Sequence, residues 1–240
     1  MRLAALVLAA LALTACESNQ ERSAKLEKAD KHREREAVAR RELAQRALTI
    51  TRQSTRVKVV STAVVRGSEG AAAIVSLRND SSTSLRDVPI RITVKNARGA
   101  SIYTNATPGL SPTLLSVALL PAHDVVTWID DQVQGTGTPA GVSAQVGEGT
   151  PASGAIPRLS VEGAHLSEAQ AEGNLVNHSA VDQQELVVDA IARRAGKIVA
   201  AGRAVLAQAT AGSSTPFQIF FVGDPSGARL EVSAPATTSG

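Results

Sequence analysis

Few side chains in this sequence are of the types that carry out chemistry, and they are spread along the chain. The 240 residues include one cysteine, Cys16, and four histidines, His32, His123, His165 and His178. The histidines are widely separated and form neither an H-E-x-x-H motif nor a cysteine–histidine cluster. A single cysteine has no partner for an intramolecular disulfide, so it is a candidate for covalent modification. No metal site is predicted.

Asp130 and Asp131 are adjacent carboxylates, the residue type that general acid–base catalysis often uses. Neighbouring residues of a strand point to opposite faces, so these two are not expected to meet one substrate. The pattern favours two polar residues where a strand leaves its sheet. The sequence has no G-x-S-x-G, Walker A or G-x-G-x-x-G motif, and GTGTPAG at residues 135–141 is expected to be a hairpin. We therefore predict neither catalytic residues nor a cofactor.

The N-terminus has the pattern of an export signal. Arg2 precedes an apolar run over residues 3–13, and small residues follow. The run is too short to span a bilayer comfortably and has the proportions of a signal-peptide core. Leu13, Thr14, Ala15 and Cys16 together resemble the lipobox of bacterial lipoproteins. The resemblance implies a signal peptide over residues 1–15, cleavage before Cys16 and a diacylglyceryl group on the Cys16 sulfur.

Lipidation of Cys16 would place the chain in the bacterial cell envelope, anchored on the extracytoplasmic side of a membrane. Two or three acyl chains hold a protein stably, since each buried CH₂ contributes about 0.8 kcal/mol. The alternative is a free cysteine after an ordinary secretory signal. With no second cysteine, stability outside the cytoplasm must come from packing rather than disulfides.

Residues 16–50 are expected to combine the lipidated cysteine with a charged helical spacer. Residues 17–50 contain no Gly or Pro, and acid-before-base pairs recur at i, i+4, for example Glu21 with Lys25. No heptad repeat is sustained, which disfavours a coiled coil. The alternative is a helix that docks on the following domain; its contact residues would be Val38, Leu43, Ala47 and Leu48.

From residue 51 the apolar period changes to two, and short β-branched runs alternate with Gly, Pro, Asn and Ser clusters. In the run VPIRITVKN, Val88, Ile90, Ile92 and Val94 are expected on one buried face. The predicted fold class is mainly β: two tandem immunoglobulin-like antiparallel β-sandwiches after the signal peptide and helix. The expected boundaries are residues 51–147 for the first sandwich, 148–156 for a linker, 157–236 for the second and 237–240 for a tail.

The two predicted sandwiches share an order of features, which predicts a tandem repeat. Each has an asparagine turn, an alternating strand, a glycine turn and an aromatic strand. The matching residues are Asn79 and Asn177, Gly99 and Gly196, and Trp128 and Phe217. Asn79 and Asn177 are expected to make Asx-type hydrogen bonds that fix the first hairpin of each sandwich. Trp128 and Phe217 are expected in the cores, and Phe220 on the outward face.

This order of features resembles the FxLYD-like, immunoglobulin-like domains of exported bacterial lipoproteins. The resemblance implies a non-catalytic role: presenting two modules that bind an envelope protein or a cell-wall polymer. An alternative is an enzyme or small-ligand-binding lipoprotein with a site between the two domains. A net charge of +3, with 25 basic and 22 acidic residues and no basic stripe interleaved with aromatics, argues against nucleic-acid binding.

Overall fold

The structure, a computed structural model, describes residues 48–68 and 70–237. The predicted signal peptide, the lipobox residues Leu13, Thr14 and Ala15, the lipidated Cys16 and the spacer up to residue 47 lie outside this range. Residues 48–50 have no regular secondary structure, so the predicted helix does not reach residue 50. All described residues belong to one structural unit, Ala44–Gly240.

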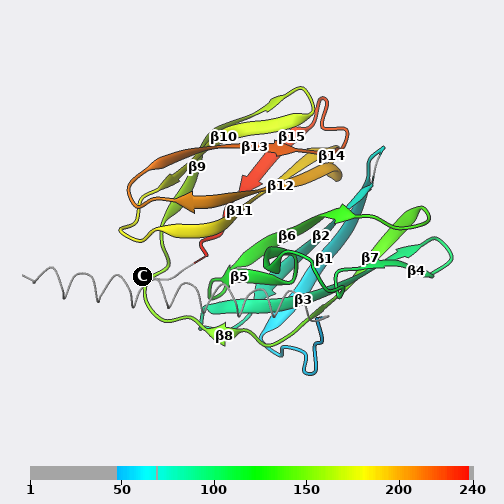
Figure 1. Ribbon diagram of the computed structural model, residues 1–240, viewed down its shortest axis with the longest axis horizontal. Helices are drawn as coiled ribbons and strands as arrows, with labels where there is room; N and C mark the ends of the chain where they lie inside the picture. Colours follow the sequence, from blue (N-terminus) through cyan, green and yellow to red (C-terminus); the bar gives the residue numbers. More distant parts are fainter. Residues whose placement is uncertain (1–47, 69, 238–240) are drawn as a thin grey trace, which may run out of the picture. The chain divides into compact units, whose positions relative to one another are not determined.

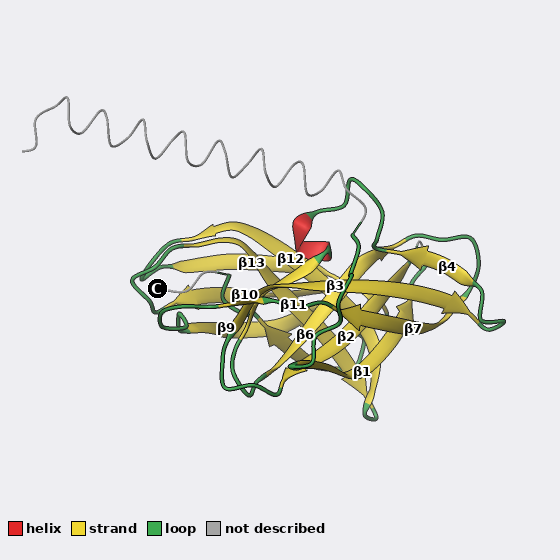
Figure 2. Cartoon of the chain, turned by 90° about the horizontal axis from the view of Figure 1, so that it is seen from below, coloured by secondary structure: helices red, strands yellow, loops and turns green. Residues whose placement is uncertain are grey.

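The described chain consists of strands and loops plus one short 3₁₀ helix, as Figure 2 shows. The elements up to residue 151 are β1 (Val57–Arg66), β2 (Ala71–Asn79), β3 (Leu85–Asn96), β4 (Ser101–Thr104), η1 (Pro112–Leu114), β5 (Ser116–Leu120), β6 (Val125–Val133), β7 (Pro139–Val146) and β8 (Thr150–Pro151). Those that follow are β9 (Leu159–Ser167), β10 (Gln170–Asn177), β11 (Gln183–Arg194), β12 (Lys197–Ala209), β13 (Ser214–Phe220), β14 (Val222–Gly223) and β15 (Arg229–Ser233).

The strands form antiparallel sheets, as the alternating sequence predicts. Strands β1–β8, here called the first half, make a sheet of order β1-β2-β6 and a second sheet of order β4-β3-β5, with β7 and β8 also paired to β3. Strands β9–β15, the second half, make sheets of order β13-β10-β9 and β14-β12-β11-β15. Among the described strands, none of the first half pairs with one of the second (Figure 1).

Each half has a hydrophobic core between its own two sheets. In the first half, Val88, Ile90, Ile92 and Val94 of β3 are fully buried, which confirms the predicted face, and Trp128 of β6 lies in the same core. In the second half, the core contains eight buried residues: Ala171, Leu175, Leu186, Val188, Ala190, Ala209, Phe217 and Ile219. Trp128 and Phe217 therefore point inward, as predicted. Each half is sandwich-like, with two sheets facing one another across a core.

A third apolar cluster joins the two halves. Ile74 of β2 and Ile129 of β6 pack with Ile191 of β11 and Ala201 of β12. The sheet β1-β2-β6 therefore has a core on each of its faces, and so does the sheet containing β11 and β12. This explains why β2 is buried at five consecutive residues, Ala71–Val75, rather than at alternate ones. We call this contact between the sheets the inter-half interface.

The two asparagines predicted to make Asx turns do so, with matching partners. The Asn79 side chain accepts from the Ser81 N–H at 3.0 Å and donates to the carbonyls of Thr83 and Leu120. Asn177 accepts from the Ser179 N–H at 3.0 Å and donates to the carbonyls of Val181 and Ala209. Both asparagines are fully buried.

The asparagine turns are not hairpins, which corrects one detail of the prediction. Asn79 ends β2 and the chain then enters β3, which belongs to the opposite sheet; the same holds for Asn177 between β10 and β11. The turns therefore carry the chain across each core, and their buried side chains satisfy backbone carbonyls that no ladder reaches. We call them the asparagine corners.

Two more connections differ from expectation. The stretch 135–141, predicted as a hairpin, leads from β6 to β7, which lie in different sheets, so it crosses the first half. Within the predicted linker 148–156, Thr150 and Pro151 pair with Arg86 and Leu85 of β3. This part of the linker extends the sheet of the first half.

Candidate functional site

The ionisable residues of the inter-half interface are the structure's strongest concentration of unusual chemistry. Their placement follows from the two-residue period of β6. Trp128 and Asp130 face the core of the first half, whereas Ile129 packs in the inter-half cluster. Thr127 and Asp131 share the face of Ile129 and are directed at the second half.

Asp130 is fully buried within β6, which overturns the prediction that it sits at an exit from the sheet. Its carboxylate accepts a hydrogen bond from the Tyr103 hydroxyl at 2.7 Å and another from the Gln132 N–H at 3.0 Å. Burial raises the pKa of Asp130 above its ordinary value, and these two hydrogen bonds oppose the rise. Burial and the Asp130 charge together raise the pKa of Tyr103. The pair is a satisfied buried contact.

Asp131 points away from Asp130, as the strand period predicts, and it is partly buried. Burial raises the pKa of Asp131, and the positive charge of Arg203 on β12 acts against that rise. Arg203 is held by η1: its guanidinium donates to the Thr113 hydroxyl at 2.5 Å. The Thr113 carbonyl also accepts from the Trp128 indole N–H at 3.2 Å. Thus η1 ties the core tryptophan to the interface arginine.

Asp189 is a buried carboxylate of the second half, only 5% exposed. It lies on β11 with Arg203 opposite it on β12 and Ser233 opposite it on β15. Its Oδ1 atom is buried and has no hydrogen-bond partner among the described residues. Burial raises the pKa of Asp189 to about 8; the charge of Arg203 lowers it and that of Asp131 raises it further.

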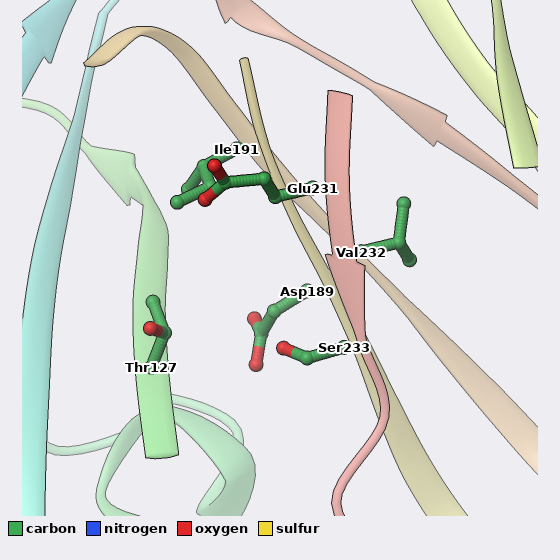
Figure 3. Close-up of a pocket in the computed structure, with 6 residues that line it drawn as sticks. All are labelled: Thr127, Asp189, Ile191, Glu231, Val232 and Ser233. Carbon is green, nitrogen blue, oxygen red and sulfur yellow. The ribbon is translucent and has the colours of Figure 1, made fainter. Parts of the chain in front are cut away.

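A small pocket opens beside Asp189. Its volume is about 130 Å³, and it is lined by Thr127, Asp189, Ile191, Glu231, Val232 and Ser233. Figure 3 shows the Asp189 carboxylate next to the Ser233 hydroxyl, with Thr127 across the pocket on β6. Glu231 is engaged by Arg193, whose Nε lies 3.0 Å from its carboxylate. The residues that remain to meet a ligand are Asp189, Thr127 and Ser233, a set suited to binding a hydrogen-bond donor.

Sequence reasoning missed Asp189, Thr127 and Ser233. A signal was present, because Asp189 interrupts the run LVVDAIA, in which apolar residues occupy positions of both parities. Such a run indicates a strand buried on both faces, where a carboxylate is costly and often functional. Alternation by itself assigns only Leu186, Val188, Ala190 and Ala192 to the interior, and it says nothing of the second face, on which Asp189 lies.

The structure does not bring the predicted histidines together. His165 Nδ1 lies 3.0 Å from the Gly163 carbonyl and His178 Nε2 lies 2.7 Å from the Ser160 hydroxyl, both local contacts. His32 lies outside the described range. Within residues 48–68 and 70–237, no group of three or more His, Cys, Asp or Glu side chains is placed to hold a metal ion. In the same residues, no helix is long and apolar enough to cross a membrane.

A second candidate surface is the outer face of the sheet β13-β10-β9. Phe220 lies there with 68% of its surface exposed, the largest value among the exposed apolar side chains of the described chain. Its cross-strand neighbour is Gln170, and the next row contains Gln218 and Glu172. Gln170 donates to the Glu172 carboxylate at 2.6 Å. The face therefore combines one aromatic ring with carboxamide and carboxylate groups.

Comparison with models of known protein families and with curated protein sequences found no match.

Proposed function

We propose that this chain is a non-catalytic, lipid-anchored protein of the bacterial cell envelope that presents two immunoglobulin-like modules to a binding partner. The anchoring part rests on the sequence Leu13-Thr14-Ala15-Cys16 after a short apolar run. Cys16 receives the lipid, residues 1–15 are removed, and the β modules stand on the extracytoplasmic side of the membrane. The partner is an envelope protein or a cell-wall polymer.

The repeated module is supported by registers that match in the two halves. Trp128 pairs with Val75, four residues before Asn79, and Phe217 pairs with Gly173, four residues before Asn177. In each half the asparagine side chain donates to the carbonyl of a matching residue at the end of β5 or β12. Repetition of the aromatic position, the corner and its partner at one spacing favours a duplicated domain over two unrelated sandwiches.

The single observation that carries the binding role is the exposure of Phe220. Aromatic residues are enriched where proteins meet their partners, so a ring that is 68% exposed on a sheet face favours a binding surface. The flanking Gln170, Glu172 and Gln218 offer donors and acceptors around the ring. Rings bind the apolar faces of sugars while amides bind their hydroxyls, so this face favours a cell-wall polymer of carbohydrate character.

A sedimentation assay with purified cell-wall polymer tests this role. The full chain should sediment with the polymer, and Phe220→Ala should reduce the bound fraction several-fold. The control is Val125→Ala, which removes apolar surface from a residue that is 50% exposed on β6. Equal loss in both variants, or binding unaffected by Phe220→Ala, would contradict the role of this face. A protein crosslinked from position 220 with no polymer binding would replace the polymer with a protein partner.

The anchoring part has its own test. Cells expressing the chain are labelled with a radioactive fatty acid, which the parent chain should incorporate. Cys16→Ala should abolish incorporation and release the chain from the membrane fraction. Ser18→Ala, two residues away, is the matched control and should be labelled like the parent.

The alternative role, a small-ligand-binding lipoprotein with a site between the two domains, is favoured by one observation. The pocket beside Asp189 lies at the inter-half interface and contains a buried carboxylate oxygen without a partner.

A further inference from the structure

The buried charges of the inter-half interface do not balance. Asp189 is buried and Asp131 is partly buried, and the one cation that acts on both is Arg203. Asp130 has its own donors on the other face of β6. Glu231, at the pocket, is paired with Arg193. One negative charge is left over whenever Asp189 is ionised, and an uncompensated buried charge is strongly unfavourable.

The unbalanced charge faces a space bounded by two hydroxyls. Thr127 and Ser233 line the same pocket as Asp189, and neither hydroxyl has a hydrogen-bond partner in the described part of the chain. Beside them the pocket is lined by the Ile191 side chain, whereas the Val232 side chain points to the other side of β15 and packs against the core of the second half. The pocket thus offers the Asp189 and Ser233 oxygens on one side, the Thr127 hydroxyl across from them, and the aliphatic surface of Ile191.

We propose that this pocket binds a primary ammonium group, with Asp189 supplying the countercharge and Thr127 and Ser233 accepting the remaining N–H groups. An –NH₃⁺ group has three donors, one for each acceptor oxygen. The volume of about 130 Å³ is that of roughly four liquid water molecules, enough for an ammonium group with a short alkyl stem. The stem lies against Ile191.

Other cations fit the same groups less well. A guanidinium prefers a bidentate carboxylate, and here only Oδ1 of Asp189 is recorded as buried without a partner. Divalent ions take six or more oxygen ligands, usually with several carboxylates. This inference does not depend on the proposed envelope role, because it uses residues on β6, β11 and β15 and not the face around Phe220.

Calorimetric titration of the full-length chain in detergent with n-propylammonium chloride tests the proposal. We expect saturable binding, with no binding of 1-propanol, which lacks the charge, or of tetramethylammonium, which lacks N–H donors. Potassium chloride at equal ionic strength measures the effect of salt. A response that potassium or tetramethylammonium reproduces would overturn the proposal, because it would show general screening of the interface charges.

Variants assign the response to the pocket. Asp189→Asn should weaken propylammonium binding at least tenfold, and Thr127→Val and Ser233→Ala should each weaken it several-fold. The control Asp87→Asn removes an exposed carboxylate of β3 and should leave the affinity unchanged. A circular dichroism spectrum and an unfolding curve verify that each variant is folded. A folded Asp189→Asn variant with unchanged affinity would overturn the assignment.

Proton release gives a readout that a structural role of Asp189 would not produce. At pH 7 the raised pKa keeps Asp189 mostly protonated, so binding of the ammonium group transfers that proton to the buffer. The heat of binding should then differ between buffers of different ionisation enthalpy, and this difference should disappear in Asp189→Asn. Absence of proton release in the parent chain would contradict an ionised Asp189 in the complex.

The amine could come from a small free molecule or from a lysine side chain of a partner protein. Comparison of propylammonium with Nα-acetyl-lysine-N-methylamide separates these sources. Tighter binding of the lysine derivative favours a partner's lysine, and tighter binding of propylammonium favours a small amine. If the full chain binds neither amine but still sediments with cell-wall polymer, this inference is refuted and the proposed function stands.

Discussion

Two buried aspartates, Asp130 in the first half and Asp189 in the second, differ in the hydrogen-bond partners of their carboxylates. Both are at most 5% exposed. Asp130 accepts hydrogen bonds from Tyr103 and Gln132, whereas Oδ1 of Asp189 accepts none and faces a pocket. A buried carboxylate with fixed donors stabilises the surrounding fold, and one without them reduces stability. We therefore expect Asp130 to stabilise the fold and Asp189 to bind a ligand.

The largest expected effect is the loss of the satisfied aspartate. Asp130→Ala leaves the Tyr103 hydroxyl and the Gln132 N–H without their acceptor and removes volume from the first core. We expect the free energy of unfolding to fall by about 2–4 kcal/mol. Urea denaturation followed by tryptophan fluorescence measures it, since Trp128 is the only tryptophan. A loss below about 1 kcal/mol would mean that the two aspartates are equivalent.

Asp189→Asn should raise the free energy of unfolding, whereas Asp130→Ala lowers it. The variant removes a buried charge without a partner, so we expect it to unfold with about 1–3 kcal/mol more free energy than the parent at pH 9. The control Asp87→Asn, at an exposed carboxylate, should change stability by less than about 0.5 kcal/mol. Destabilisation of Asp189→Asn at pH 9 would indicate that Asp189 has a partner that stabilises it.

Comparison of the parent with Asp189→Asn also shows how Asp189 makes the free energy of unfolding depend on pH. The native pKa of Asp189, about 8, is above its unfolded value near 3.8, so the native state holds an extra proton between these values. The parent should therefore be most stable relative to Asp189→Asn below pH 4 and lose that advantage as the pH rises through 8. Burial also raises the pKa values of Asp130 and Asp131, but both residues are present in the parent and in the variant. The difference between the two stability–pH curves therefore reports on Asp189.

Removal of one donor from the satisfied site should have a smaller effect. Tyr103→Phe keeps the ring in place but deprives Asp130 Oδ2 of its 2.7 Å hydrogen bond, while Gln132 continues to donate to Oδ1. We expect a loss of about 1–2 kcal/mol at pH 7. Because the lost donor favoured the ionised form, the loss should be smaller at low pH, where Asp130 is protonated. A loss that is independent of pH would show that the hydroxyl acts only by packing.

The strands were predictable because their signal is local. The alternation of Val88, Ile90, Ile92 and Val94 is visible in sequence, and the expected run VPIRITVKN falls on the observed strand β3. The strand β4 was not expected, because four residues do not establish a period. The Asx-type hydrogen bonds of the asparagine corners were predictable, because they connect Asn79 to Ser81 and Asn177 to Ser179. The path of the corners from sheet to sheet was not.

The candidate pocket was not predictable, because it depends on contacts between distant parts of the chain. Thr127 and Asp189 are in different halves, and a one-face reading of β11 leaves Asp189 in water. Ile129 and Ile191 could not be paired from sequence, since each looks like the outward residue of its own strand. The packing of one sandwich on the other buries what the alternation predicts as exposed.

The smallest expected effect concerns two serines that repeat the contrast between the aspartates. The Ser233 hydroxyl faces the pocket without a partner, so Ser233→Ala should change the free energy of unfolding by less than about 0.5 kcal/mol. The Ser179 hydroxyl donates to Asn177 at 2.7 Å in an asparagine corner, so Ser179→Ala should cost about 1 kcal/mol. Paired urea curves measure both. A Ser233→Ala variant that is as destabilised as Ser179→Ala would place Ser233 in the fold, because a hydroxyl reserved for a ligand contributes nothing until the ligand arrives.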